Sequence, residues 1–394
     1  MAWIEQFLQE TEKIPTPEIF RKWAAITAIS GALERKVWIN AAGGPIYPNL
    51  FTLLVGPPAS GKSNAIKPVS ELWGKMKGLC KAPDNVTKAS MIDALGRAMR
   101  TVIHNGGSSA TTFCALNVIA PEFGVFFTHH DLEFLSVLNH IYDDPPSYKE
   151  ERRTVDPVNI LRPHMVILAG TQPDYLGTFL PDEAWGMGFA SRLIMIYAGE
   201  CPTGDFFAPY NNQTPELITD LHRIFELDGE FEWEEAARNE INSWRASGCP
   251  PRPTHGKLTH YVGRRAVHTA KLAMISCVSR GDEMVITMED IDNAREWLIE
   301  NEKNMPDIFK AMNMKSDGQI IKELHHYLYQ MYATTSLDKR KPIHEKVIWR
   351  FLENKVPSPT IPKIIEGAEK GGYIQRAPYP DEWIPVAMDV SERS

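Results

Sequence analysis

The sequence predicts an α/β fold built around a parallel β-sheet, followed by a helical region and a small C-terminal α/β unit. Four short, mostly apolar runs alternate with segments of helical periodicity, and they lie at 50–55, 115–120, 164–170 and 191–197. Runs that are apolar on both faces are typical of buried strands in a parallel sheet. The chain has 394 residues and is 43% hydrophobic, which is enough for two or three globular domains.

The first part of the chain is predicted to contain helices before the sheet begins. Residues 1–45 form an N-terminal helical segment, because Phe20, Trp23 and Ile26 recur at helical spacing. The sheet core is predicted at 46–205. Its expected elements are, in order, a strand, two helices, a strand, a helix, a polar insert and two strands, at 50–55, 62–77, 88–104, 115–120, 131–142, 143–162, 164–170 and 191–197.

Two further regions are predicted after a proline-containing linker. Residues 206–312 form an α-helical lid, in which Thr287-Met288-Glu289-Asp290 is a capping-type helix start. Residues 313–394 are predicted to be winged-helix-like, because three helices precede a turn and a strand, at 317–332, 343–353, 360–370 and 371–376. Residues 315–376 carry eleven basic and seven acidic side chains, which favours contact with nucleic acid, although units of this kind also serve as protein contacts.

Composition excludes several classes of protein. The net charge is −8 and the pI about 5.9, so the chain is not a histone-like binder with an overall basic field. The five cysteines are scattered without a C-x-x-C pair, which argues against disulfide and zinc frameworks and favours a reducing cytoplasm. The N-terminus does not resemble a signal peptide, and no apolar run approaches the length of a membrane span. We therefore expect a cytoplasmic protein with no membrane contact.

The run Gly56-Pro57-Pro58-Ala59-Ser60-Gly61-Lys62-Ser63 lies between the first predicted strand and the next helix. In this strand–loop–helix context, G-x-x-x-x-G-K-S predicts a phosphate-binding loop for ATP and Mg²⁺ rather than an ordinary glycine-rich turn. Lys62 is expected to reach the β- and γ-phosphates, and the Ser63 hydroxyl to bind Mg²⁺. The phosphates would lie at a helix N-terminus, whose dipole favours negative charge. The expected nucleotide-binding residues are Gly56, Pro57, Ala59, Ser60, Gly61, Lys62, Ser63 and Asn64.

Hydrolysis requires a carboxylate that orients water beside the γ-phosphate and helps to hold Mg²⁺. Glu122, at the end of the strand 115–120, is the best candidate, and the plainer alternative is that it only caps the strand end. The residue before it is Pro121 instead of the usual aspartate, so Asp131 and Glu133 are alternatives for the metal. The next strand ends at Thr171-Gln172, where a polar side chain is placed to sense the γ-phosphate.

Two arginines are candidates for stabilising charge on the phosphates. Arg192 lies at the start of the last predicted core strand, from which it would project toward the nucleotide of a neighbouring subunit. A locally salt-bridged arginine is the alternative interpretation. Gly263-Arg264-Arg265 opens a helix of the predicted lid, and Arg265 is the preferred candidate for reaching back to the phosphates. A solvated helix N-terminus is the competing interpretation there.

The polar insert is the candidate DNA contact within the core. It combines an aromatic residue with three basic ones, Tyr148, Lys149, Arg152 and Arg153. The basic side chains are suited to phosphates and the tyrosine to stacking on bases. Neighbouring glutamates offset part of the charge, so a plain solvated loop is the alternative.

Taken in order, these motifs resemble those of AAA+ ATPases. Ser191-Arg192-Leu193-Ile194 resembles the arginine-finger segment of ring helicases of the minichromosome-maintenance type. Tyr47-Pro48-Asn49-Leu50, Pro121-Glu122-Phe123-Gly124 and Gly170-Thr171-Gln172-Pro173 resemble the helicase-like ATPase domain of phage and mobile-element replication proteins. The resemblance covers roughly residues 15–305.

The resemblance implies a P-loop NTPase of AAA+-like type that assembles into a hexameric ring and moves along single-stranded DNA. Relatives often carry a primase, for which residues before 15 leave no room, so we expect a stand-alone motor of phage or mobile-element replication. Its expected partners are other replication proteins, in the bacterial host cytoplasm if the chain is phage-encoded. A helicase loader or recombination mediator is the alternative within the ATPase class. A DNA-binding scaffold that uses ATP only to assemble is the alternative outside it, because Pro121 replaces the usual aspartate.

Overall fold

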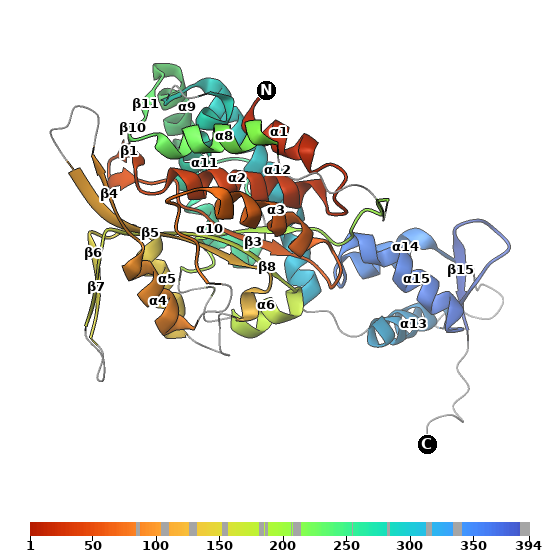
Figure 1. Cartoon of the computed structure of the whole chain (residues 1–394). Helices are drawn as coiled ribbons and strands as arrows, with labels where there is room; N and C mark the ends of the chain where they lie inside the picture. The colour runs from red at the N-terminus through yellow and green to blue at the C-terminus, as the bar shows by residue number, and fades with distance from the viewer. Residues whose placement is uncertain are drawn as a thin grey trace. The chain divides into compact units, whose positions relative to one another are not determined.

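The computed structural model describes residues 1–83, 87–103, 110–125, 132–151, 157–180, 185, 188–205, 207, 214–253, 255–281, 284–312, 317–333 and 341–386. The protein is a mixed α/β structure that divides into two compact units, Met1–Met305 and Pro306–Ser394 (Figure 1).

The first unit is organised around a five-stranded sheet with the order β4-β5-β8-β3-β9. Four of its strands are parallel, namely β5 (Ala110–Ala120), β8 (Pro163–Thr171), β3 (Phe51–Val55) and β9 (Leu193–Tyr197). Every residue of β3, β8 and β9 is buried, as their apolar sequences require. The predicted parallel sheet is therefore confirmed.

The edge of the sheet differs from the prediction. The helix expected at 88–104 ends at Arg97 as α4 (Lys88–Arg97), and β4 (Met99–Ile103) follows it antiparallel to β5. Thr101-Val102-Ile103 is a β-branched run, and Asn105-Gly106 after it is a hairpin signal in the sequence. These local preferences outweigh the helical spacing that continues from α4.

The predicted polar insert also contains regular structure. β6 (Ser147–Glu150) and β7 (Val158–Leu161) pair antiparallel, with Tyr148 opposite Ile160. This two-stranded ribbon follows α5 (Leu132–Tyr142) and precedes β8.

Helices cover both faces of the sheet (Figure 1). α2 (Glu18–Leu33) and α3 (Lys62–Lys75) lie on one face, and α4, α5 and α6 (Pro173–Phe179) lie on the other. α2 is buried almost throughout, and its Thr27 hydroxyl donates to the Thr52 hydroxyl of β3 at 2.7 Å. The sheet is therefore the middle layer of three.

The region predicted as a lid lies, up to Met305, in the same compact unit as the sheet. It contains α8 (Pro215–Glu226), α9 (Glu235–Ala246), α10 (Thr259–Val262), α11 (Arg265–Arg280) and α12 (Met288–Met312). Residues of this region up to Leu298 share one hydrophobic cluster with α2 and with the N-terminal α1 (Trp3–Glu10). The indole of Trp3 donates to the Leu217 carbonyl at 3.0 Å, which ties α1 to α8.

Two small sheets border this helical region. β1 (Val37–Ala41) pairs antiparallel with β2 (Gly44–Ile46) and parallel with β10 (Gly229–Glu230). β11 (Glu232–Trp233) pairs with β12 (Val285–Ile286).

After the end of α12, the described residues of the second unit form the helices α13, α14 and α15 and a three-stranded antiparallel sheet of order β13-β15-β14. Its elements are α13 (Asp317–Ala333), β13 (Ile343–His344), α14 (Glu345–Glu353), α15 (Ile361–Lys370), β14 (Ile374–Arg376) and β15 (Glu382–Pro385). Leu324, Ile348, Ile364 and Trp383 form part of its own apolar core. The three helices lie close to their predicted positions.

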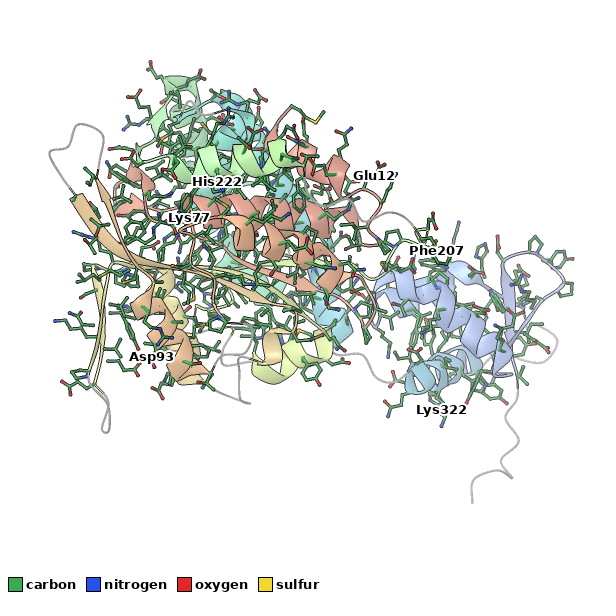
Figure 2. The ribbon with its side chains drawn as sticks, viewed as in Figure 1. Glu12, Lys77, Asp93, Phe207, His222 and Lys322 are labelled. Carbon is green, nitrogen blue, oxygen red and sulfur yellow. The ribbon has the colours of Figure 1, made fainter. Side chains whose placement is uncertain are left out.

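Three side chains labelled in the first unit, Glu12, Lys77 and Phe207, are exposed (Figure 2), and Phe207 is one of several exposed large apolar residues. Within the described residues, no helix combines the length and the apolar character that crossing a membrane requires.

Candidate functional site

The loop between β3 and α3, the predicted phosphate-binding loop, contains two residues in the left-handed region. Ala59 and Gly61 have positive φ angles of 61° and 83°, and α3 begins directly after Gly61. Left-handed residues turn the backbone sharply, so that successive N–H groups can face one concavity. Gly56 is required for close packing, because a Cβ there would lie 2.5 Å from the Ser60 hydroxyl and 2.6 Å from the Ala198 carbonyl.

Lys62 is held over this loop. Its ammonium donates to the carbonyls of Gly56 and Pro57 at 2.8 Å each and to the Ser60 hydroxyl at 3.2 Å. Burial lowers the pKa of Lys62, and the negative charge of Glu122 acts in the opposite direction. Lys62 and Glu122 are therefore close enough to interact electrostatically.

The register of the sheet explains how Glu122 comes near Lys62. Val55 pairs with Thr171, and Ala120 pairs with Ala169, so the carboxyl ends of β3, β8 and β5 lie side by side. Gly170 lets these ends approach closely, because a Cβ there would lie 2.6 Å from the Pro121 carbonyl and 3.4 Å from Cβ of Lys62. The role of Gly170 was not predicted, although glycine inside a strand often marks such a close approach.

The two residues predicted to sense the γ-phosphate differ in their surroundings. Thr171 is fully buried, and its hydroxyl donates to the Gln172 carbonyl at 3.4 Å. Gln172 is half-buried at the N-cap of α6, where its side chain makes no capping hydrogen bond. Of the two side chains, Gln172 is the one with access to a ligand at the strand ends.

Ser63 and Glu122 are the candidate magnesium ligands, and both are exposed. Mg²⁺ commonly takes only one or two protein oxygens besides water and substrate phosphates, so a hydroxyl and one carboxylate fit that chemistry. In the described part of the chain, no group of three or more His, Cys, Asp or Glu residues is arranged to hold a metal. Of the alternative carboxylates, Glu133 is paired with Lys88 at 2.5 Å, and Asp131 lies outside the described residues.

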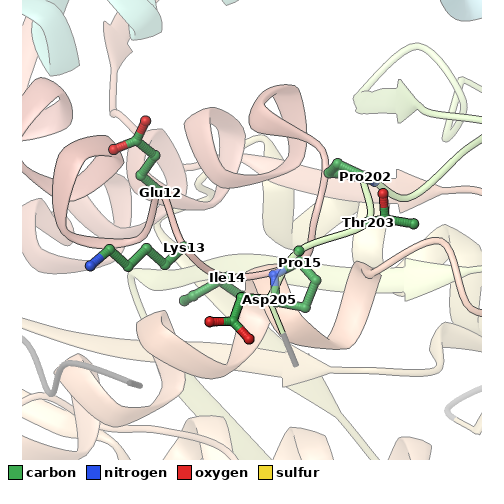
Figure 3. Close-up of a pocket in the computed structure, with 8 residues that line it drawn as sticks. Glu12, Lys13, Ile14, Pro15, Pro202, Thr203 and Asp205 are labelled. Carbon is green, nitrogen blue, oxygen red and sulfur yellow. The ribbon is translucent and has the colours of Figure 1, made fainter. Parts of the chain in front are cut away.

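A cavity of about 310 Å³ lies beside the phosphate-binding loop (Figure 3). It is lined by two segments, Glu12–Pro15 and Pro202–Asp205. The first segment is bound to the loop, because Asn64 Nδ2 donates to the Pro15 carbonyl at 3.1 Å and the Thr16 hydroxyl to the Gly61 carbonyl at 2.9 Å. This cavity was not predicted, because the sequence around Pro15 indicated only the start of a helix.

Arg192 lies at the opposite end of the sheet from the phosphate-binding loop. Leu193, the next residue, pairs with Phe51 at the start of β3. The five residues of β3 span about 17 Å, so Arg192 is far from the loop of its own chain.

Arg192 is fixed by Asp143 and shares that partner with Arg264. Arg192 Nε lies 3.2 Å from Asp143 Oδ1, and its Nη1 donates to the Gly188 carbonyl at 2.8 Å. Arg264 Nη1 is 3.2 Å from the same Asp143 oxygen. Burial raises the pKa of Asp143, but the hydrogen bonds and charges of the two arginines outweigh it and lower this pKa below its usual range.

Arg265 does not fit its predicted role. Its guanidinium is fully buried and forms two hydrogen bonds of 2.7 Å with the Glu302 carboxylate, and it also contacts the Cys249 carbonyl. These contacts hold the side chain inside the helical region instead of directing it to the phosphate-binding loop. Its neighbour Arg264 is the arginine that the structure joins to Arg192.

The predicted DNA-contacting residues are only partly described. Lys149 is exposed on β6. Tyr148 is 9% exposed, and its hydroxyl donates to the Glu150 carboxylate at 2.6 Å, so its ring is not available for stacking. Arg152 and Arg153 lie outside the described residues.

No protein-family model matches the chain, and no curated protein matches its sequence.

Proposed function

We propose that this chain is an ATP hydrolase with an AAA+-like P-loop NTPase fold that moves along single-stranded DNA as a ring of identical subunits, as a helicase or translocase in DNA replication. The observation that carries the proposal is the convergence of Lys62, Glu122 and Gln172 at the carboxyl ends of three adjacent parallel strands. Ligands of open α/β sheets bind at this edge of the sheet.

The phosphates of ATP are held by the loop and Lys62. The backbone N–H groups of the loop and the start of α3 offer donors, and the Lys62 ammonium exchanges its loop carbonyls for the β- and γ-phosphates. The nucleoside occupies the cavity formed by Glu12–Pro15 and Pro202–Asp205, whose volume of about 310 Å³ lies in the range of small-molecule sites. Ser63 and Glu122 hold Mg²⁺, which supplies charge neutralisation on the phosphate oxygens when bound.

The residues at the strand ends have separate roles in ATP hydrolysis. Glu122 orients the attacking water and accepts its proton while the new bond to the γ-phosphorus forms and the bond to the β,γ-bridging oxygen breaks. Gln172 contacts the γ-phosphate, and Lys62 stabilises the charge on its oxygens. Pro121 leaves Glu122 as the carboxylate at this strand end, so both tasks of the usual acidic pair fall to it.

A second chain completes the site. About 17 Å separates Arg192 from the loop at the far end of β3, which is farther than an arginine side chain extends. Arg192 therefore acts on the nucleotide of a neighbouring subunit, and Asp143 positions it for that contact. A closed ring supplies such a neighbour for every site.

DNA contact is assigned to the β6–β7 ribbon and to the C-terminal unit. Lys149 is exposed on the ribbon and offers a phosphate contact. The C-terminal order of helix, strand, two helices and two strands, with β15 central in the sheet, agrees with a winged-helix-like module.

The core of the proposal is tested by nucleotide turnover. Lys62→Ala is expected to abolish ATP binding, because it removes the ammonium from the loop, and Glu122→Gln to retain binding while losing hydrolysis. Glu216→Gln is the matched control, since Glu216 is an exposed glutamate on α8 with no assigned role in the site. ATPase activity of Glu122→Gln equal to that of the control would remove Glu122 from the mechanism.

Ring action is tested by mixing subunits and by unwinding. Arg192→Ala subunits mixed with wild type are expected to reduce ATPase activity more than in proportion to their fraction, because each impairs the next site. Simple proportional dilution would contradict action between subunits. Unwinding of a forked duplex with ATP and Mg²⁺ tests the motor, whereas ATPase stimulation by single-stranded DNA without unwinding indicates a loader or mediator, and binding without hydrolysis indicates a scaffold.

A further inference from the structure

A groove crosses the helical region of the first unit, away from the phosphate-binding loop. One cavity of about 840 Å³ lies between the β1–β2 hairpin, α9 and the first turns of α11. A second cavity of about 510 Å³ continues past the end of α9. Arg245, Gly263 and Ala266 line both cavities, so the two cavities adjoin, and together they are called the groove.

Arginine side chains line this groove. Arg238 and Arg245 are seven residues apart on α9 and lie on the same face of the helix, with Asn242 between them. Arg252 continues the row in the second cavity, where its Nε donates to the Gly248 carbonyl. The groove therefore carries a row of three cationic side chains.

These three arginines are exposed and available to a ligand. Glu240 of α9, two residues after Arg238, is paired with Arg295 of α12 at 2.5 Å. Within the described part of the chain, the ion pairs of the first unit do not include Arg238, Arg245 or Arg252. Their guanidinium groups can therefore pair with an anion that comes from outside the chain.

The remaining lining of the groove is mostly apolar and includes an aromatic ring. Ile46 and Val267 contribute aliphatic surface, and Trp233, which is half-buried against the hydrophobic core, contributes its accessible part. Residues 43–44 form part of one wall with open space around them, since a Cβ at either glycine would meet no atom within 4 Å. A flat ligand group therefore has both a ring to stack on and room to enter.

The charge of the groove contrasts with that of the chain. The net charge of the chain is −8, yet the lining residues of the two cavities include three arginines and, among acidic residues, Glu230. Arg238 and Arg245 are separated by about 10 Å along the helix axis, and Arg252 extends the row. This spacing suits an extended polyanion better than a single phosphate group.

We propose that this groove binds single-stranded nucleic acid, with the arginines contacting successive phosphates and Trp233 stacking on a base. A positively charged groove with an aromatic side chain is the arrangement by which proteins bind single strands without reading their sequence. The site is separate from the β6–β7 ribbon and from the C-terminal unit. Binding there requires no nucleotide, so the inference stands independently of the proposed ATPase activity.

The test measures the affinity of the full chain for fluorescein-labelled oligo(dT) and oligo(rU) by anisotropy at several salt concentrations. Arg238→Ala, Arg245→Ala and Arg252→Ala are each expected to weaken binding about three- to tenfold and to reduce the slope of log affinity against log salt by about 0.7. Arg223→Ala is the matched control, because Arg223 is an exposed helical arginine on α8 that pairs with Asp220. Equal affinities in the control and in all three groove variants would overturn the proposal. A preference for oligo(dT) or for oligo(rU) identifies the strand as DNA or RNA.

Two further measurements locate the strand. Photo-cross-linking with a 5-bromouracil oligonucleotide is expected to label the peptide that contains Trp233, and labels confined to 147–161 or to 317–386 would overturn the assignment. Competition by poly-glutamate as effective as by oligonucleotide would instead indicate an acidic protein partner. A change of oligomer size in Arg245→Glu with unchanged oligonucleotide affinity would identify the groove as a contact between copies of the chain. Lys62→Ala is expected to leave this binding unchanged, which separates it from the nucleotide site.

Discussion

Replacing Gly170 by alanine is expected to abolish most ATP hydrolysis while leaving ATP bound. The added Cβ would lie 2.6 Å from the Pro121 carbonyl oxygen and 3.4 Å from Cβ of Lys62. Ordinary contact begins near 3.4 Å, so the ends of β5 and β8 must separate by roughly 0.8 Å, which moves Glu122 relative to Lys62. A displacement of this size at a catalytic group costs about a hundredfold in rate.

The assay compares steady-state ATPase rate, affinity for a fluorescent ATP analogue and the free energy of unfolding. We expect kcat to fall about a hundredfold, with a loss of stability of about 1–3 kcal/mol from overpacking. Affinity for the analogue is expected to change little, because the phosphate-binding loop and Lys62 retain their contacts.

Gly74→Ala is the matched control. Gly74 lies in α3, where an added Cβ would meet no atom within 4 Å, so alanine there is expected to be neutral or to stabilise the helix by up to about 1 kcal/mol. Wild-type hydrolysis by Gly170→Ala would refute the close approach as the cause of the site's geometry. Loss of ATP binding in parallel with hydrolysis would show that the substitution damages the loop rather than the position of Glu122.

Three further predictions concern residues around Arg192 and α11. Asp143→Asn is expected to weaken the hold on Arg192 and to lower the ATPase rate of the assembled protein severalfold with unchanged ATP affinity; an unchanged rate would show that Arg192 needs no such support. Arg265→Ala is expected to lower the free energy of unfolding by about 3–5 kcal/mol in urea titrations, because it leaves Glu302 buried without a partner. A stable variant with a selective loss of ATP turnover would instead support the role predicted for Arg265 at the phosphates. Burial lowers the pKa of His268 from its usual 6.5 to about 3. The neutral ring therefore stabilises the fold fully above pH 6.5, and this stabilisation is lost as the pH falls from 6.5 to about 3. Between pH 7 and pH 5, His268→Gln should therefore lose about 2 kcal/mol less stability than wild type, and parallel pH profiles would contradict this.

The strands and the position of the loop between β3 and α3 could be predicted because their signals are local. A run such as 50–55 is apolar on both faces, and G-x-x-x-x-G-K-S fixes the loop by spacing alone. β4 was missed because the helical spacing of α4 continues into a β-branched run, so two local preferences compete over the same residues.

The partners of the arginines could not be predicted because they depend on tertiary contacts. Arg264 and Arg265 are adjacent in the sequence, yet one step around the helix directs the first to Asp143 and the second to Glu302. Asp143 lies 49 residues before Arg192, and only the folded sheet brings them together. The cavity beside the loop likewise joins segments near 12 and 203 that carry no shared motif.

Strand β3 has a mechanical consequence for the proposed ring of subunits. Its five buried residues are hydrogen-bonded to β8 on one side and β9 on the other, so the strand is rigidly held within the sheet. One end carries the phosphate-binding loop of one nucleotide, and the neighbouring strand β9 begins beside the other end, directly after Arg192. In such a ring, a movement of the loop on ATP turnover would also move Arg192, which contacts the nucleotide of the adjacent subunit. The rigidity of the sheet would then determine the order in which the subunits hydrolyse ATP.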